Sequence, residues 1–270
     1  MPITNRKHLL TVLGLNEKQL EKLLSQIPKL YKPYIKKEVK SEGKTKERDI
    51  CPSVGKLLAI QHRIKKQIFD LHVLPEYIQG GVKGKDCILN SKRHQGLNHH
   101  FCLDLKNFFP SVKNHRVNKV LLRLGYSPDV ASIITKLITF KNQVPQGVPT
   151  STSITNLVLH SEIDIKLEKV IEGKNIVYTR WVDDLNFSSQ EDFKNLSAQI
   201  TGIISNAKFK INRKKTFYKL GKVLITGCDV EQNRISAPQK LKDKLLDPKR
   251  SESSKLGVQN FINRIENTNH

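Results

Sequence analysis

Three aspartates lie in sequence contexts that favour chemistry over simple solvation. Asp104 sits inside the apolar stretch 101–105, and Asp183 and Asp184 sit between apolar residues of 178–187. A carboxylate in a buried strand is costly unless it is paired or binds a cation. Carboxylates on neighbouring strands would form an oxygen site suited to Mg²⁺, and two such ions about 3.5–4 Å apart stabilise phosphoryl transfer. The alternative is that Asp183-Asp184 is only a polar turn.

Periodicity and turn signals predict the elements that must position these acids. Residues 101–105 are predicted to form a short strand, and 176–188 two strands that meet at the paired acids. Because adjacent strand residues point to opposite faces, one acid of the pair can face Asp104. Further strands are predicted within 34–50 (a hairpin with its turn at 41–44), 208–212, 216–218 and 223–230. Helices are predicted over 5–30, 53–74, 116–124, 128–139, 153–169, 192–207 and from 237 onward. This alternation around a small sheet predicts an α+β fold.

Charge indicates the partner class. The chain has 270 residues, enough for one large domain or two closely joined subdomains, and a net charge of +22. This large positive charge favours nucleic acid as the first candidate partner and an anionic membrane surface as the second. The basic segments 29–48 and 208–222 are interleaved with apolar residues, which predicts a folded basic groove rather than a solvated tail.

Composition also excludes several protein classes. Hydrophobic residues make up 37% of the chain, and no apolar run approaches the roughly 18 residues of a membrane span. The N-terminal residues have no signal-peptide core, so we expect a cytoplasmic protein without a membrane partner. Four scattered cysteines at no metal-ligand spacing predict reduced thiols rather than a disulfide framework.

Four segments, in order, resemble the motifs of bacterial reverse transcriptases, which are RNA-directed DNA polymerases. They are 103–111 (LDLKNFFPS), 144–151 (VPQGVPTS) with 155–157 (TNL), 180–185 (RWVDDL) and 211–216 (INRKKT). The resemblance extends over about residues 30–240. It implies an enzyme, a nucleotidyltransferase that uses dNTPs and an RNA template.

The resemblance assigns catalytic roles position by position. Asp104 and Asp183 would hold two Mg²⁺ ions, for which Mn²⁺ can substitute, and Asp184 would support them. The backbone carbonyl of Leu105 would complete one metal shell. Lys215 is placed to protonate the leaving pyrophosphate, and a template contact in the groove is the alternative role for this lysine.

It also assigns residues that bind the incoming nucleotide. Phe109 falls where the family places an aromatic ring that would collide with a 2′-hydroxyl, thereby favouring dNTPs. Core packing is the alternative for Phe109, and it is the role expected of Phe108. Gln146 would pack near the nucleotide and the template, and Gly147 would let the backbone approach them.

The same resemblance implies a right-hand polymerase fold with fingers, a palm and a short helical thumb. We expect interleaved fingers and palm over residues 1–232 and a reduced thumb over 233–270. Arg48 resembles the fingertip arginine that grips the triphosphate, for which a planar guanidinium is suited. Lys40 or Lys44 would assist it.

Two short elements resemble the retron branch of the family. Residues 90–94 (NSKRH) are similar to its Asn-Ala-x-x-His element and 225–227 (ITG) to its Val-Thr-Gly element, while 256–262 resembles its last thumb helix. A turn with a satisfied His94 and an ordinary strand end are the alternatives. The branch implies a noncoding RNA template and primer, a cDNA product, a role in antiphage defence and a toxin or effector protein as partner.

Other functions stay open at this point. Trp181 and Val182 replace the family's usual Tyr and Ala, and Thr152 replaces its usual Pro. One alternative is another defence-associated polymerase that makes untemplated or homopolymeric DNA. A second is an RNA-binding module without catalysis, which Trp181 favours and three intact acids disfavour. An RNA polymerase is disfavoured by Phe109.

Overall fold

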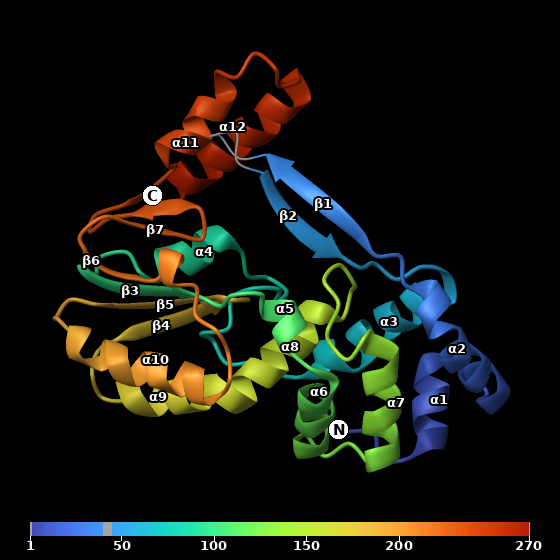
Figure 1. The fold of residues 1–270 in the computed structure, drawn as a ribbon. Coiled ribbons are helices and arrows are strands. Elements are labelled where there is room, and N and C mark those ends of the chain that lie inside the picture. The colour runs from blue at the N-terminus through green and yellow to red at the C-terminus, as the bar shows by residue number, and fades with distance from the viewer. Residues whose placement is uncertain (1, 40–44, 270) are drawn as a thin grey trace. The chain divides into compact units, whose positions relative to one another are not determined.

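Each half of the molecule is built from two separate stretches of the chain. The computed structural model describes residues 2–39 and 45–269. One unit comprises Met1–Leu74 and Asn107–Glu162, and the other comprises Pro75–Lys106 and Ile163–His270. In the described ranges, no helix has both the length and the apolar character needed to cross a membrane. The mixture of helices and sheets confirms the predicted α+β class (Figure 1).

The first unit is mainly helical with one antiparallel hairpin. Its helices are α1 (Arg6–Leu13), α2 (Glu17–Leu30), α3 (Gly55–Gln67), α5 (Phe108–Ser111), α6 (Asn114–Arg123), α7 (Pro128–Ile138) and α8 (Ser151–Leu159). The hairpin pairs β1 (Tyr34–Val39) with β2 (Thr45–Ile50). The turn predicted at 41–44 lies outside the described residues, as do Lys40 and Lys44.

Two helices, not one, cover the stretch predicted to be helical over 5–30. Helix α1 ends at Gly14, whose φ of 60° lies in the left-handed region that glycine enters without a Cβ penalty. Asn16 then caps α2 reciprocally with Gln19, because each side chain bonds the other residue's backbone N–H. The leucine periodicity continues across this break, so periodicity alone predicts a single helix.

The second unit contains a four-stranded antiparallel sheet in the order β4-β5-β3-β6. These strands are β3 (His99–Asp104), β4 (Val177–Trp181), β5 (Asp184–Ser189) and β6 (Phe217–Leu220). A smaller antiparallel sheet holds β7 (Val223–Ile225), β8 (Cys228–Val230) and β9 (Ile235–Ser236). The helices are α4 (Cys87–Lys92), α9 (Ile165–Ile171), α10 (Ser197–Asn206), α11 (Gln239–Lys242) and α12 (Glu252–Asn267).

Alternation along the strands gives the large sheet two different faces. Phe101 and Tyr178 pack on Phe187 on one face, with ring centroids 6.3 Å and 4.6 Å from it. Helices α9 and α10 lie along this apolar face (Figure 1). The opposite face carries Asp104 and Asp184 in facing register. The sheet therefore keeps its aromatic core on one side and presents its acids on the other.

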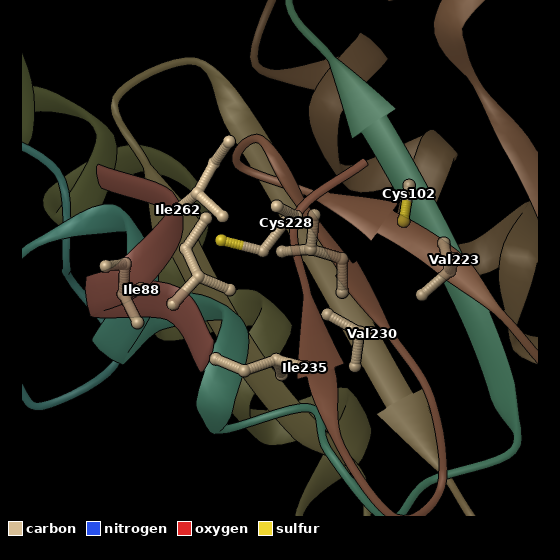
Figure 2. Close-up of a cluster of buried hydrophobic side chains, with 10 residues drawn as sticks. Ile88, Cys102, Val223, Cys228, Val230, Ile235 and Ile262 are labelled. Atoms are coloured by element: carbon tan, nitrogen blue, oxygen red, sulfur yellow. The ribbon is translucent and has the colours of Figure 1, made fainter. Parts of the chain in front are cut away.

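A second core lies between the small sheet and two helices (Figure 2). Ile88 of α4, Val223, Cys228 and Ile262 of α12 are buried together there. All four cysteines are free, and Cys102 and Cys228 are buried, so the prediction of reduced thiols is confirmed. The helical C-terminus is also confirmed, since α12 contributes apolar side chains to this core. The division into fingers-and-palm and thumb at residue 232 stays a prediction.

Candidate active site

A two-residue turn carries Asp183 at the tip of the β4–β5 hairpin. Trp181 and Asp184 are the last paired residues of the two strands, so Val182 and Asp183 form the loop. Val182 has a φ of 58°, a conformation that β-branched residues rarely adopt and that costs about 1–3 kcal/mol. The predicted meeting of two strands at the paired acids is therefore confirmed, with Asp183 in the turn and Asp184 on the strand.

Asp104 and Asp184 lie directly opposite each other on β3 and β5. Asp104 is only 6% exposed. Burial, followed by the charges of Asp183 and Asp104, raises the pKa of the Asp184 carboxyl to about 7. The three acids are thus crowded enough to disfavour full ionisation unless positive charge is supplied.

Two side chains from the segment after α10 bind the Asp104 carboxylate. The Asn212 amide donates to Asp104 Oδ1 at 2.7 Å, and Lys215 Nζ lies 2.5 Å from Asp104 Oδ2. Partial burial lowers the pKa of Lys215, but the hydrogen bond to Asp104 and the charges of the three acids outweigh it and raise that pKa. Lys215 is accordingly a cation held directly against the carboxylates.

The backbone of Leu105 ties β3 to the acidic turn. Its N–H donates to the Asp183 carbonyl at 3.0 Å, and it forms an isolated bridge with Ile211. The prediction of a strand over 208–212 is wrong, because the bridge between Leu105 and Ile211 is the only β-pairing that the described residues make in this segment. Lys208 has a φ of 62°, which takes the chain out of extended conformation as it enters the segment.

The acidic cluster is suited to divalent cations, although it is not preformed for them. In the described part of the chain, no group of three or more His, Cys, Asp or Glu side chains is arranged to hold a metal ion. However, burial and the neighbouring charges of Asp183 and Asp104 raise the pKa of Asp184, although the charge of Lys215 lowers it. Oxygen ligands with excess negative charge are the donors that Mg²⁺ prefers, so the residues fit such an ion.

An open cavity of about 570 Å³ adjoins Asp104 and Asp184 within the second unit. Its walls are formed by Cys102, Leu103, Asp104, Trp181, Asp184, Asn186, Lys214, Lys215, Phe217, Leu224, Thr226 and Gly227. Asn186 is 4% exposed, and its Nδ2 finds no hydrogen-bond partner among the described residues. The cavity therefore combines apolar walls, two lysines, two acids and an unsatisfied amide donor.

In the first unit, Gln146 and Gly147 lie against the end of β2. The Gln146 carbonyl accepts from the Cys51 N–H at 2.7 Å. Gly147 has a φ of 108°, and a Cβ there would meet Ile50 Cγ2 at 2.9 Å. Both the backbone angle and the close approach thus require glycine at this position.

The other two predicted nucleotide-binding residues also belong to the first unit. Arg48 on β2 is half-buried, with its Nε 3.2 Å from Glu38 Oε2 on β1. Phe108 is buried, as expected for core packing, whereas Phe109 is partly exposed with its ring centroid 5.3 Å from that of Phe108. The ring of Phe109 is therefore accessible to a ligand, whereas the ring of Phe108 is not.

Sequence reasoning missed the residues that support the acidic turn. Arg180 and Asp164 form a fully buried ion pair beneath it, and Gly80 packs against its backbone. Asp164 lies in the helical stretch predicted over 153–169, where a single acid usually indicates a solvated face. The one available signal was Arg180 inside the apolar strand 177–181, since a buried cation requires a partner.

The two retron-like elements contact each other across more than 130 residues of sequence. The Asn90 amide donates to Thr226 Oγ1 at 3.2 Å, and Ser91 Oγ donates to the Ile225 carbonyl at 2.7 Å. His94 is fully buried, with its ring nitrogens 2.8 Å and 2.7 Å from the hydroxyls of Ser188 and Thr179. The first element thereby links the β7–β8 turn, which lines the cavity, to the large sheet.

This buried histidine gives a prediction for stability against pH. Burial lowers the pKa of His94 to about 3, whereas an unfolded histidine has a pKa of about 6.5. The unfolded state therefore binds the extra proton, and stability is lost as the pH falls below about 6.5. We expect His94→Gln to reduce the slope of unfolding free energy between pH 6 and 5 by about 1 kcal/mol per pH unit. Urea denaturation across this range measures the slope. Equal slopes for the wild-type protein and His94→Gln would contradict the conclusion that His94 is buried in its uncharged form.

Comparisons with known proteins agree on one family. Residues 35–258 match the family described as reverse transcriptase (RNA-dependent DNA polymerase). Retron Se72 reverse transcriptase of Salmonella heidelberg (strain 579083-10) is 30% identical over 221 residues, which cover 80% of this chain and 57% of that protein. Retron Ec86 reverse transcriptase of Escherichia coli is 30% identical over 202 residues, which cover 73% and 63%. The chain thus spans little more than half the length of these curated relatives.

Solved structures with similar folds are more distant in sequence. Telomerase from Candida albicans in complex with a fragment of telomeric RNA superposes with a TM-score of 0.57 at 11% identity, covering 85% of this chain and 54% of that one. Apo telomerase from Candida tropicalis gives a TM-score of 0.54, also at 11% identity, covering 84% and 50%. At such identities the likeness shows the polymerase fold alone.

Proposed function

The chain belongs to the reverse transcriptase (RNA-dependent DNA polymerase) family, and we propose that it copies an RNA template into DNA by metal-dependent nucleotidyl transfer. The observation that best supports this proposal is the meeting of Asp104, Asp183 and Asp184 at one end of an antiparallel sheet. The acids are crowded, Asp104 and Asp184 border an open cavity, and all three occur in a chain with a net charge of +22. A purely structural role would not require three acids crowded together at one end of a sheet.

Each acid has a distinct part in this proposal. Asp104 and Asp183 would hold two Mg²⁺ ions, replaceable by Mn²⁺, with Asp184 and the Leu105 carbonyl completing the ligand set. When bound, the ions would stabilise the charge that develops on the attacking and leaving oxygens. The β-sheet register fixes Asp104 and Asp184 side by side, so the two backbones would not need to move when the cations bind.

Lys215 would hold a proton close to the reacting phosphates. Its ammonium lies on Asp104 in the structure, and its raised pKa keeps it protonated at neutral pH. A protonated amine at that place can donate to the departing pyrophosphate. The alternative role, a contact with template phosphate, needs the same charge but no proton transfer.

Four residues would bind the incoming nucleotide or the template. Arg48 would contact the triphosphate through its planar guanidinium. Gln146 and Gly147 would approach the base pair that forms, because Gly147 presents backbone without a side chain. Phe109 would pack against the sugar of the incoming nucleotide.

The role of Phe109 predicts a change in sugar selectivity. Phe109→Ala would remove the ring that collides with a 2′-hydroxyl, so we expect the ratio of rNTP to dNTP incorporation to rise by about 10- to 100-fold. Single-nucleotide incorporation kinetics with dGTP and GTP measure this ratio. Phe108→Leu is the matched control, because Phe108 is buried and its change should lower stability without altering selectivity.

The retron-like elements extend the proposal to the partners. Their mutual hydrogen bonds and the similarity to retron reverse transcriptases support a structured noncoding RNA as template and primer, with its cDNA as product. We place the enzyme in bacterial antiphage defence, with a toxin or effector protein as its protein partner.

One experiment tests the polymerase and the template together. The purified protein is incubated with a primed RNA template, dNTPs and Mg²⁺, and the DNA products are sequenced. Products complementary to the RNA support the proposal. Homopolymeric or random products would indicate an untemplated polymerase instead. RNA binding without any DNA synthesis would overturn the proposal that the protein is an enzyme.

A further inference from the structure

The ion pair between Arg180 and Asp164 lies beneath the acidic turn and is completely buried. Arg180 Nη2 lies 2.7 Å from Asp164 Oδ2, and Nε lies 3.1 Å and 3.0 Å from the two carboxylate oxygens. The Tyr178 hydroxyl also donates to Asp164, at 2.9 Å. The contact is therefore bidentate, and the Tyr178 hydroxyl also fixes the orientation of the Asp164 carboxylate.

Such a pair needs an explanation beyond stability. Removing two charges from water costs about as much as their attraction returns, so buried ion pairs are weak contributors to folding free energy. In some proteins such pairs are retained because they impose one geometry. Arg180 precedes Asp183 by only three positions, which places this geometry at the start of the turn.

Arg180 reaches the turn itself through a further nitrogen. Its Nη1 donates to the Val182 carbonyl at 3.2 Å. Its own carbonyl accepts the N–H groups of Gln79 at 2.9 Å and Gly80 at 3.3 Å, and its N–H donates to the Tyr77 carbonyl. Arg180 is thus anchored by its side chain to Asp164, the residue before α9, and by its backbone to 77–80.

The contact with Val182 falls at the strained residue of the turn. Val182 has a φ of 58°, which a valine does not adopt readily. Strain of this kind persists only where surrounding contacts over-determine the conformation. A guanidinium locked by Asp164 and donating to the Val182 carbonyl is such a contact.

We infer that Arg180 is a positioning residue, which uses its buried pairing with Asp164 to hold the Val182–Asp183 turn in the conformation that directs Asp183 toward metal. This inference rests on the proposed function in so far as Asp183 is a metal ligand. Arg180 is fully buried, and it acts by fixing the backbone that carries the ligand.

Two variants separate positioning from folding. Arg180→Lys keeps a buried cation for Asp164 but loses the fork that also reaches Val182. The double variant R180M/D164N removes both charges, keeps an acceptor for Tyr178, and leaves no unpaired ion. A matched control is R116M/E162Q, which neutralises another largely buried ion pair that belongs to the first unit.

The readouts are thermal unfolding, Mn²⁺ affinity by electron paramagnetic resonance, amide hydrogen exchange of 181–184, and kcat and KM for dNTP. We expect R180M/D164N to unfold cooperatively, to bind Mn²⁺ about 10- to 100-fold more weakly, and to lose kcat by a similar factor. Exchange at the turn should accelerate while KM for dNTP changes little. Arg180→Lys should give smaller changes of the same kind, and the control variant none.

A rescue makes the test specific. Asparagine adopts left-handed backbone angles more readily than valine, so adding Val182→Asn to R180M/D164N should recover part of the Mn²⁺ affinity and the exchange protection. Wild-type exchange, Mn²⁺ affinity and kcat in R180M/D164N would overturn the inference. A wild-type protein that makes no DNA would instead overturn the proposed function, while the exchange and Mn²⁺ measurements would still decide the role of Arg180.

Discussion

Asp183→Asn is expected to lower Mg²⁺-dependent dNTP incorporation by about a thousandfold or more. Asparagine keeps the shape of the side chain but removes the charge that binds the cation, and metal-based stabilisation of the transition state is worth several kcal/mol, each 1.4 kcal/mol of which is tenfold in rate. Asp104→Asn should behave in the same way, because Asp104 lies in the same acidic cluster. Primer extension on an RNA template, measured before substrate depletion, gives the rates.

The fold should survive these replacements. Burial, followed by the charges of Asp183 and Asp104, raises the pKa of Asp184, so removing the charge of Asp183 should leave the melting temperature without metal unchanged or higher. Asp192→Asn is the control, since Asp192 is exposed on the same unit and its replacement should leave the rate unaltered. An Asp183→Asn protein that polymerises at the wild-type rate would show that the assigned site is wrong.

The acids were predictable because their local sequence is anomalous. Asp104 within 101–105 and the pair within 178–187 place charge where the neighbours predict buried strands, and burial of charge needs a compensating partner. The structure brings these three together with Lys215. Mixed helix and strand periodicity likewise predicted the α+β class correctly.

What could not be predicted depends on long-range contacts. Asp164 resembles a surface acid of a helix, and only the fold places it against Arg180. The left-handed angle of Val182 contradicts the preference of valine, so no local rule predicts it. The break between α1 and α2 was missed for the opposite reason, since Gly14 and Asn16 are local signals that the leucine periodicity outweighed.

A substitution at Gly80 is expected to have the second large effect on stability and activity, because the Gly80 backbone packs directly on the backbone of the acidic turn. A Cβ at Gly80 would lie 2.5 Å from the Val182 nitrogen and 2.9 Å from the Trp181 carbonyl carbon. These atoms belong to the main chain and cannot rotate aside as a side chain would. We therefore expect Gly80→Ala to destabilise the protein by about 1–3 kcal/mol and to displace the turn that carries Asp183.

The same substitution elsewhere in the second unit provides the control. Gly202 lies inside α10, and a Cβ there would meet nothing within 4 Å, so Gly202→Ala should stabilise the helix by up to about 1 kcal/mol. Urea denaturation of both variants gives the two free energies, and primer extension gives their rates. We expect loss of polymerisation in Gly80→Ala alone. A stable, active Gly80→Ala protein would mean that the loop 77–80 can move away from the turn. The position of Asp183 would then depend on Arg180 and the hairpin register, and not on that loop.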